Sequence, residues 1–378
     1  MKNIDKNVIA LGWVSFFTDM ASSMVTTLLP IFVVYVLHEG VDKLGIIIAI
    51  ATFVSYALRI FFGYLSDKYQ IVKPFVVAGY AISAVTKPLL MFSHSYASVA
   101  LLRSLERMGK AVRSASKDSL ISSYSQKEKA GKSFGFHKMM DVSGEMSGAL
   151  IIVALFYFTT QNEALIREIF GWTLLPGLLG VFIVLFFVKD SVKISKESTK
   201  VVSRKDYRLL WVLGSYFFYL FFFMSDQYFI LRAKDVGMTL TQIPLLVITS
   251  TLTQALLSYY SGTLIDRFGS KILLFIAYLF GIFSLLCLRE GVLWLAFVFL
   301  GAFTVVSLNA LRVYIAKNAN SQGFMYGILY GGIAIFSALG ALVIGEIWHF
   351  YSFEDVTLFS LMGTVIMSLI LLFSLRKN

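Results

Sequence analysis

Long apolar runs dominate the chain, and short polar stretches separate them. Each run has about 20 residues or more, the length that a helix needs to cross a membrane. The pattern predicts about twelve membrane helices, at 8–37, 44–66, 73–93, 96–122, 133–159, 168–188, 209–233, 240–265, 270–288, 291–316, 323–349 and 352–375. It therefore indicates an all-α integral membrane protein with a six-helix half at 1–188, a polar linker at 189–208 and a second six-helix half at 209–378.

Composition supports a lipid environment. The chain is 58% hydrophobic and 15% charged, whereas soluble domains contain about a quarter charged residues. The net charge of +11 would suggest nucleic-acid binding in a soluble protein, but cytoplasmic loops of membrane proteins also collect Lys and Arg. If the N-terminus is cytoplasmic, 20 of the 33 Lys and Arg residues lie in inside segments, 5 in outside loops and 8 within spans. We therefore expect a multi-pass protein of the cytoplasmic membrane, with both termini and the linker inside and no nucleic-acid partner.

A short phrase occurs twice, 199 residues apart, as GYLSDK at 63–68 and GTLIDR at 262–267. Each copy lies between two long apolar runs. A membrane chain with matching halves is built like a secondary transporter, whose substrate site lies between the halves. One chain would contain the whole site, so we expect a monomeric functional unit that works by alternating access.

The repeated phrase resembles the signature loop of the major facilitator superfamily (MFS), G-x-L-x-D-R-x-G-R-[RK]. The second copy matches it at Gly262, Leu264, Asp266, Arg267, Gly269 and Lys271. The first copy keeps Gly63, Leu65 and Asp67, with Lys68 in place of Arg. The resemblance covers essentially the whole chain, and it implies the MFS fold of about 12 transmembrane helices in two pseudo-symmetric six-helix halves.

Three further stretches resemble a prokaryotic branch of this superfamily described as efflux permeases. They are SFFTD at 15–19, RSLERMGKAVR at 103–113 and GFHKMMD at 135–141. The chain departs from that branch at Ser23, where Glu is usual, and at Thr27 and Ala149, where Pro is usual. The missing Glu removes one candidate proton carrier, and Ala149 weakens the glycine-proline motif that marks antiporters in the superfamily.

Charged residues within the predicted spans are the candidates for chemistry, because a charge in the bilayer costs a few kcal/mol and normally faces a cavity or a partner. The predicted coupling and substrate residues are Asp19, Arg59, Arg103, Glu106, Arg107, Lys110, Lys138, Asp141, Glu145, Asp226 and Arg312. Spacings of three or four residues place those at 103–113 on one helix face and those at 138–145 on another. These two faces would neutralise each other and Asp19. In the first half the in-span charges, Lys87 and Arg113 included, sum to +3, which favours an anionic substrate.

Two of these residues have a more specific expectation. Arg103 matches the arginine of the fourth helix that the resemblance associates with proton coupling. We favour Asp19 as the coupling carboxylate, because the first helix lines the cavity in this fold. The alternative for Asp19 is a fixed ion pair with a cation of the fourth or fifth helix.

A cytoplasmic gate is predicted at the repeated loops. Its residues are Gly63, Asp67, Lys68, Arg113, Gly262, Asp266 and Arg267. The two aspartates lie at helix ends, where they should pair with basic residues or helix termini and hold one conformation closed.

The chain contains no G-x-x-x-x-G-K-[ST] loop and no catalytic-triad pattern, and its four histidines lack metal-ligand spacing. We therefore expect no enzyme activity, no cofactor and no metal. The predicted function is proton-coupled efflux of a small organic molecule, anionic or amphipathic, so protons and that substrate are the expected partners besides lipid. Two alternatives remain: proton-coupled uptake of an organic acid or a siderophore-like ligand, and a membrane receptor that does not transport.

Overall fold

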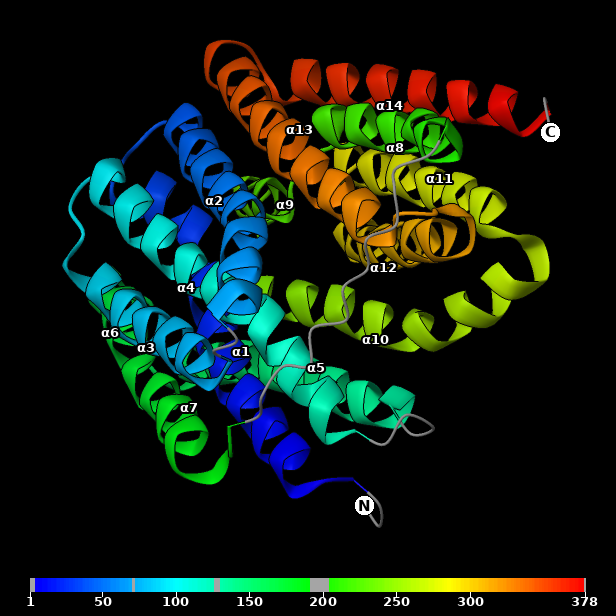
Figure 1. The fold of residues 1–378 in the computed structure, drawn as a ribbon. Helices are drawn as coiled ribbons and strands as arrows, with labels where there is room; N and C mark the ends of the chain where they lie inside the picture. Colours follow the sequence, from blue (N-terminus) through cyan, green and yellow to red (C-terminus); the bar gives the residue numbers. More distant parts are fainter. Residues whose placement is uncertain (1–3, 70–71, 126–129, 191–203, 377–378) are drawn as a thin grey trace. The chain divides into compact units, whose positions relative to one another are not determined.

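The structure is a computed structural model that describes residues 4–69, 72–125, 130–190 and 204–376, which form helices joined by short turns (Figure 1). The α-helices are α1 (Lys6–Ile31), α2 (Val41–Tyr69), α3 (Lys73–Leu89), α4 (Tyr96–Tyr124), α5 (Ala130–Phe158), α6 (Glu163–Trp172), α7 (Leu174–Phe187), α8 (Arg204–Phe222), α9 (Asp226–Asp235), α10 (Ile243–Phe268), α11 (Ser270–Arg289), α12 (Leu293–Asn318), α13 (Gln322–Phe350) and α14 (Phe353–Arg376). A π-helical segment, η1 (Phe32–Val36), extends α1, and a 3-10 turn, η2 (Leu90–Phe92), extends α3.

Ten helical segments in the described ranges are long and apolar enough to cross a membrane. An eleventh is the pair Ile243–Ser258 and Tyr260–Phe268, if its 48° bend lies within one span. Helix α4 is not among them, because its charged side chains make it too polar. It has 29 residues, however, and is therefore as long as α5, which is one of the ten. With α4 these segments make up the series of about twelve, which confirms the prediction of an all-α membrane protein.

Two of the predicted spans differ from the structure: one begins earlier than predicted, and the other is interrupted. The span predicted at 168–188 begins earlier, at Glu163, because the side chain of Asn162 accepts a hydrogen bond from Leu165 N at 2.9 Å and caps α6. The span predicted at 209–233 breaks after Phe222 and resumes as α9. Ser225 caps this second piece by accepting a hydrogen bond from Gln227 N at 3.3 Å.

The chain divides into two compact units. The first unit contains Met1–Glu39, Ile50–Lys196 and Leu240–Leu245, and the second contains Gly40–Ala49, Glu197–Thr239 and Leu246–Asn378. The beginning of α2 belongs to the second unit, where a Cβ on Gly45 would lie only 2.8 Å from Ala341 O. Most of the linker predicted at 189–208 lies outside the described residues, so the division into halves stays a prediction.

Glycines allow two helix pairs of the first unit to approach closely. On α5, a Cβ added to Gly144 would lie 2.2 Å from Phe16 O of α1. Gly79 of α3 and Gly109 of α4 face each other, and a Cβ on either would lie 2.7 Å or less from the backbone oxygen of the other. The pairs α1–α5 and α3–α4 are therefore packed backbone to backbone, which brings their polar side chains together.

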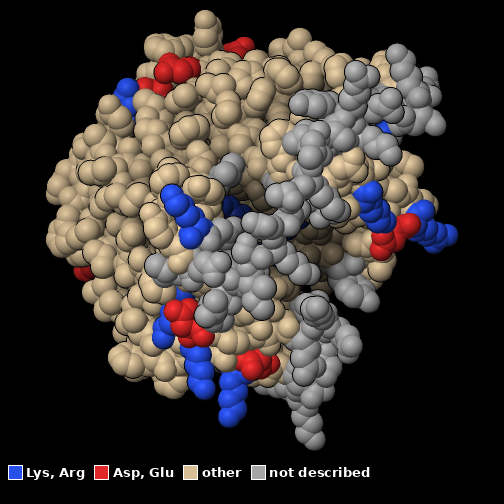
Figure 2. Space-filling model, viewed as in Figure 1, with Lys and Arg blue, Asp and Glu red and all other residues tan. Residues whose placement is uncertain are grey.

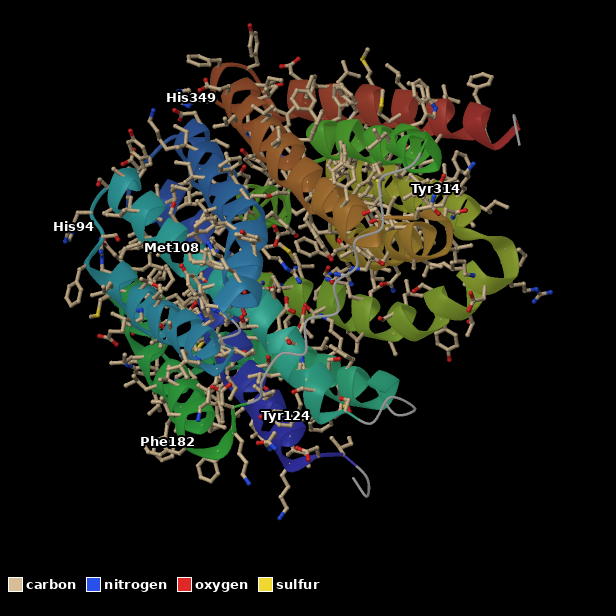
Figure 3. The ribbon with its side chains drawn as sticks, viewed as in Figure 1. His94, Met108, Tyr124, Phe182, Tyr314 and His349 are labelled. Atoms are coloured by element: carbon tan, nitrogen blue, oxygen red, sulfur yellow. The ribbon has the colours of Figure 1, made fainter. Side chains whose placement is uncertain are left out.

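Aromatic side chains fill the core of the second unit. Tyr219 of α8 stacks on Tyr278 of α11 with ring centroids 4.1 Å apart, and its hydroxyl donates to Tyr278 O at 2.8 Å. Other rings of α8 point outward, such as Phe218, which is 50% exposed. In the first unit Phe182 of α7 is likewise exposed (Figure 3), and its ring lies 4.8 Å from that of Phe186 between centroids. Most of the described surface in Figure 2 carries no charged side chain, as lipid contact requires.

Candidate functional site

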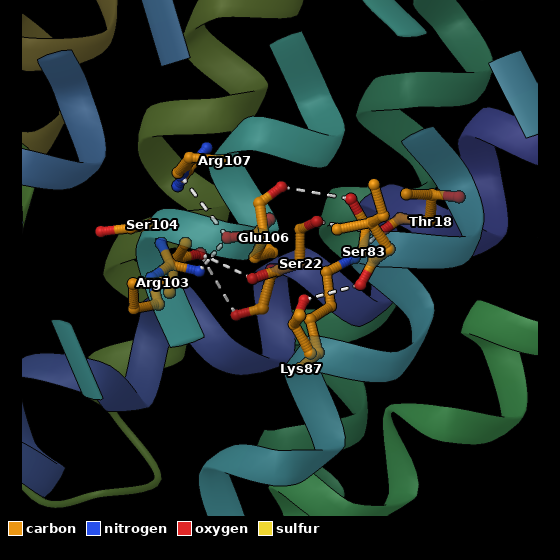
Figure 4. Close-up of polar contacts among 12 residues, drawn as sticks. Thr18, Ser22, Ser83, Lys87, Arg103, Ser104, Glu106 and Arg107 are labelled. Carbon is orange, nitrogen blue, oxygen red and sulfur yellow. Dashed lines mark hydrogen bonds and ion pairs between the residues drawn. The ribbon is translucent and has the colours of Figure 1, made fainter. Parts of the chain in front are cut away.

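The charged face of α4 contains a tightly paired carboxylate. Glu106 Oε2 lies 2.6 Å from Arg103 Nη1 and 3.6 Å from Arg107 Nε (Figure 4). Both Glu106 and Arg103 are almost fully buried. The predicted neutralisation between α4 and α5 therefore does not describe Glu106, which pairs with arginines three residues before it and one residue after it on its own helix.

Lys87 of α3 joins this cluster from the side (Figure 4). Its ammonium donates a hydrogen bond to Thr18 O of α1 at 3.1 Å, and the residue is 1% exposed. On the same helix, Ser83 Oγ donates to Glu106 O at 3.2 Å. The sequence marked Lys87 as a charge within a span, but only the structure shows that it ties α3 to α1 beside the paired carboxylate of α4.

Arg113 was predicted in the cytoplasmic gate, and the structure places it in the α3–α4 interface. Its Nη1 donates to Ser83 Oγ at 2.7 Å and to Gly79 O at 3.3 Å, and its guanidinium lies 4.5 Å from the ring centroid of Tyr80. These contacts are possible because Gly79 has no side chain at the point where α4 crosses it. The guanidinium is thus held by α3 in a defined position.

A polar cavity of about 170 Å³ lies between α1, α3, α4 and α5, within the first unit. Its lining residues are Ser15, Thr18, Asp19, Tyr80, Lys110, Arg113, Ser114, Lys117, Lys138, Asp141 and Glu145. The cavity therefore brings together Asp19, Lys110, Lys138, Asp141 and Glu145 of the predicted coupling and substrate residues. Arg59, Arg103, Glu106 and Arg107 do not line it.

Asp19 faces this cavity from α1. Within the described part of the chain its carboxylate forms no hydrogen bond and no ion pair. It does lie within electrostatic range of Lys87, Lys110 and Lys117. The fixed ion pair that was the alternative interpretation of Asp19 is therefore not seen among those residues.

His137 is a residue that the sequence did not assign to the site. Its Nε2 lies 2.9 Å from Ser15 Oγ of α1, and its Nδ1 lies 3.3 Å from Asp141 Oδ1, one turn further along α5. The imidazole is buried next to the cavity. No spacing in the sequence could have found this contact with α1, because Ser15 and His137 are 122 residues apart.

The first copy of the repeated loop packs against α4. A Cβ on Gly63 would lie 3.3 Å from Ala115 Cβ, Arg59 Nη2 lies 3.3 Å from Asp118 Oδ2, and Ser116 Oγ donates to Ser66 Oγ at 2.9 Å. The side chain of the predicted gate residue Asp67 lies outside the described residues, and Lys68 lies over the ring of Tyr69 at 5.8 Å. Arg59 thus lies beside the gate loop and not at the cavity.

In the second copy, Asp266 Oδ1 lies 2.7 Å from Lys317 Nζ at the end of α12. Around Gly262 nothing approaches within 4 Å of an added Cβ, and Arg267 lies over the ring of Phe268 at 5.2 Å. Elsewhere in this unit, Arg312 Nη2 donates to Tyr330 Oη at 3.3 Å, and Asp226 is exposed at the start of α9. The roles given to these residues stay predictions.

The family model of the Major Facilitator Superfamily matches the chain at residues 11–233 and again at 211–378. An uncharacterized MFS-type transporter of Methanocaldococcus jannaschii is 29% identical over 98% of this chain and 96% of its own length. An uncharacterized protein of Mycobacterium tuberculosis is 24% identical over 88% of this chain and 84% of its own length.

Solved structures share the architecture. A mutant of the nucleoside transporter NupG has a TM-score of 0.80 at 12% identity, over 97% of this chain and 98% of its own. A bacterial homologue of the human lysosomal transporter Spinster has a TM-score of 0.73 at 13% identity, over 98% and 96%. The human organic anion transporter MFSD10 has a TM-score of 0.69 at 13% identity, over 97% and 99%. At these identities the likeness shows the fold alone, and it confirms the predicted fold class.

Proposed function

Because the chain belongs to the major facilitator superfamily, it is a membrane transporter, and we propose that it uses a proton gradient to export a small organic molecule across the cytoplasmic membrane. One chain would form the complete functional unit, with both termini in the cytoplasm. Substrate and protons would reach the cavity alternately from the two sides of the membrane.

The observation that carries this proposal is the carboxylate of Asp19. It faces a polar cavity, and it has no hydrogen-bond or ion-pair partner among the described residues. A carboxylate within a membrane-spanning helix is retained at an energetic cost, so a role in binding ions or protons is the expected one. In this proposal the proton binds at Asp19 in one conformation of the transport cycle and leaves in another, as the cavity opens to the two sides of the membrane in turn.

The direction of transport rests on the sequence. The stretches at 15–19, 103–113 and 135–141 resemble efflux permeases, and the structure places residues of all three around the cavity or the Glu106 cluster. The substrate is expected to be anionic or amphipathic, since cations outnumber carboxylates on the cavity wall.

Uptake by symport is the second candidate, and the same charge excess favours it. An anion held by the lysines would favour a proton on Asp19, so anion and proton would bind and move together. Two departures from the efflux branch, Ser23 and Ala149, lie on α1 and α5, the helices that carry Asp19 and Lys138.

The test is the lumenal pH of proteoliposomes that contain the purified protein, under an imposed proton gradient. Organic anions, cations and amphoteric compounds are added in turn. We expect a compound that drives proton movement, with a sign that reports antiport. In Asp19→Asn this proton movement should fall to the level of protein-free vesicles, whereas exchange of the same compound without a gradient should persist.

The matched control is Asp5→Asn, on the same helix. Asp5 caps α1 by accepting a hydrogen bond from Asn7 N at 2.7 Å, and Asn is an equally good cap. In this variant, proton movement should be coupled to the added compound as it is in the wild type. Full coupling in Asp19→Asn would contradict the proposed coupling site, and proton movement in the symport direction would replace export by uptake.

A further inference from the structure

We propose that the exported molecule is a small amphoteric compound with one cationic amino group and at least one acid group. This inference rests on the proton-coupled export proposed above. The structural basis is one carboxylate and three lysines that face the same cavity and have no hydrogen-bond or ion-pair partner among the residues that the structure describes.

Not all charges of the cavity wall are available to a ligand. Arg113 is held by Ser83 and Gly79, and Asp141 is held by His137. Glu145 also has an interaction with a neighbour. The groups that form neither a hydrogen bond nor an ion pair within the described ranges are Asp19, Lys110, Lys117 and Lys138.

The three lysines come from two helices, α4 and α5, while Asp19 comes from α1. Lys110 and Lys138 are exposed and Lys117 is half-buried, so a ligand can reach their ammonium groups. Ammonium groups that line one cavity repel one another and attract an anion. Three unpaired ammonium groups therefore favour a ligand with one or two acid groups. The cavity has about 170 Å³, below the range of roughly 300–1,000 Å³ typical for drug-sized ligands, so the part of the ligand held here is small.

Export in exchange for protons adds a requirement at Asp19. In an antiporter, the proton and the substrate must oppose each other's binding, and this coupling is reciprocal. An anion placed near Asp19 does the opposite, because a negative charge favours the protonated carboxyl. A purely acidic substrate would therefore be carried together with the proton and not against it.

A cationic amino group resolves the conflict. An amino group that pairs with Asp19 needs the ionised carboxylate. Binding of the amino group therefore displaces the proton, and protonation of Asp19 releases the amino group. A pure amine would meet three unpaired lysines in the same cavity and would be repelled. Only a ligand that offers an acid to the lysines and an amine to Asp19 satisfies both walls and is also exchanged for a proton.

The experiment uses the purified full-length chain and matched trios of probes. Each trio contains a free amino acid, its N-acetyl derivative and its amide, built on L-alanine, L-leucine, L-phenylalanine, L-glutamate and 4-aminobutyrate. Binding is measured by titration calorimetry, and proton release by an indicator dye in weakly buffered solution. We expect the free form of at least one trio to bind and to release protons. Its N-acetyl and amide forms should bind at least about tenfold more weakly, as expected when a charged hydrogen-bonding group is lost.

Variants assign the two ends of the ligand. Asp19→Asn should abolish proton release and weaken binding of the free form, but it should not weaken binding of the N-acetyl form. Lys138→Gln should weaken binding of both the free and the N-acetyl form by about tenfold or more. Lys271→Gln is the control, because this lysine lies in the second unit over the ring of Tyr314, and it should leave binding unchanged.

Three results would overturn the inference: N-acetyl forms that bind as tightly as the free forms, proton uptake on binding of the free form, and no binding of any free form. Failure of the amphoteric-substrate inference can be distinguished from failure of the proposed function. Proton-coupled export of an acid without an amino group would leave the function standing and reject the amphoteric substrate. Amphoteric binding with proton release, but without coupled flux in proteoliposomes, would reject the function and keep the ligand class.

Discussion

At the scale of single residues, Glu106 and Lys110 show that one helix face can meet two different environments. They lie one turn apart on α4, so the sequence assigns them to the same stripe. Glu106 is enclosed with Arg103 and Arg107, whereas Lys110 lines the cavity. We expect the paired part of the stripe to stabilise the first unit, and we propose that Lys110 takes part in ligand binding.

The first residue-scale prediction concerns that paired part. Glu106→Gln leaves Arg103 buried without its carboxylate, so it should destabilise the protein by about 3 kcal/mol, as loss of one partner of a buried ion pair does. Thermal unfolding of the purified protein in detergent measures this as a lower Tm. The control is Asp118→Asn, because the side chain of Asp118 is 48% exposed in its pair with Arg59, and an exposed pair contributes at most about 1 kcal/mol. Equal Tm values for the two variants would contradict the structural role of Glu106.

His137 is the residue whose position only the fold could give. The sequence shows a histidine near one end of a predicted span, without any ligand spacing. The structure places it between Ser15 and Asp141. This contact exists because α1 and α5 pack so closely that a buried hydroxyl of one helix reaches the imidazole of the other.

At the scale of elements, the pairing of α1 with α5 depends on glycine. Gly144 lies directly against the backbone of Phe16, and Gly148 against Met20. A side chain at either position would push the helices apart and separate His137 from Ser15. The geometry of the cavity is therefore set by small residues that carry no chemistry themselves.

This packing yields an element-scale prediction. Gly144→Ala should lower stability by about 2 kcal/mol through overpacking, because the new methyl would lie 2.2 Å from Phe16 O. Gly135→Ala, on the same helix, is the matched control, since nothing lies within 4 Å of an added Cβ there. That change should be neutral or should stabilise by up to about 1 kcal/mol, because Ala favours helix more than Gly. Tm values of the two purified variants decide it, and a neutral Gly144→Ala would show that α1 and α5 tolerate a wider separation.

At the scale of the whole molecule, the described residues of the two units differ in their distribution of charge. The cavity charges come from α1, α4 and α5 of the first unit. The core of the second unit is built on stacked aromatic rings around Tyr219 and Tyr278. The loops at 63–68 and 262–267 repeat in sequence, but the charged cavity described here lies in the first unit alone.

Orientation is the whole-molecule prediction. In a Cys287→Ser background, Glu290→Cys and Asn318→Cys place single thiols just before and at the end of α12, at exposed positions. In right-side-out vesicles, a membrane-impermeant maleimide should label Glu290→Cys at once. It should label Asn318→Cys only after permeabilisation, because the Lys and Arg count puts that end in the cytoplasm. The reverse pattern would invert the topology of the whole chain.

The sequence by itself determined the membrane class, the series of about twelve helices and the family. Apolar length, the repeated loop and the alternation of spans are local features, and in lipid every backbone group must be satisfied within the helix. The sequence also identified Asp19, Lys110 and Lys138 as charges that need a polar surrounding. It could not say which charges pair with one another, because residues spaced three or four apart share a face whatever that face meets. Only the tertiary structure decided that Glu106 is enclosed by arginines, that Arg113 is held by α3, and that Asp19 faces a cavity with unpaired lysines. Those distinctions depend on which helices approach each other at their glycines, as α3 and α4 do at Gly79 and Gly109 and α1 and α5 do at Gly144, and such contacts join residues that are distant in the sequence.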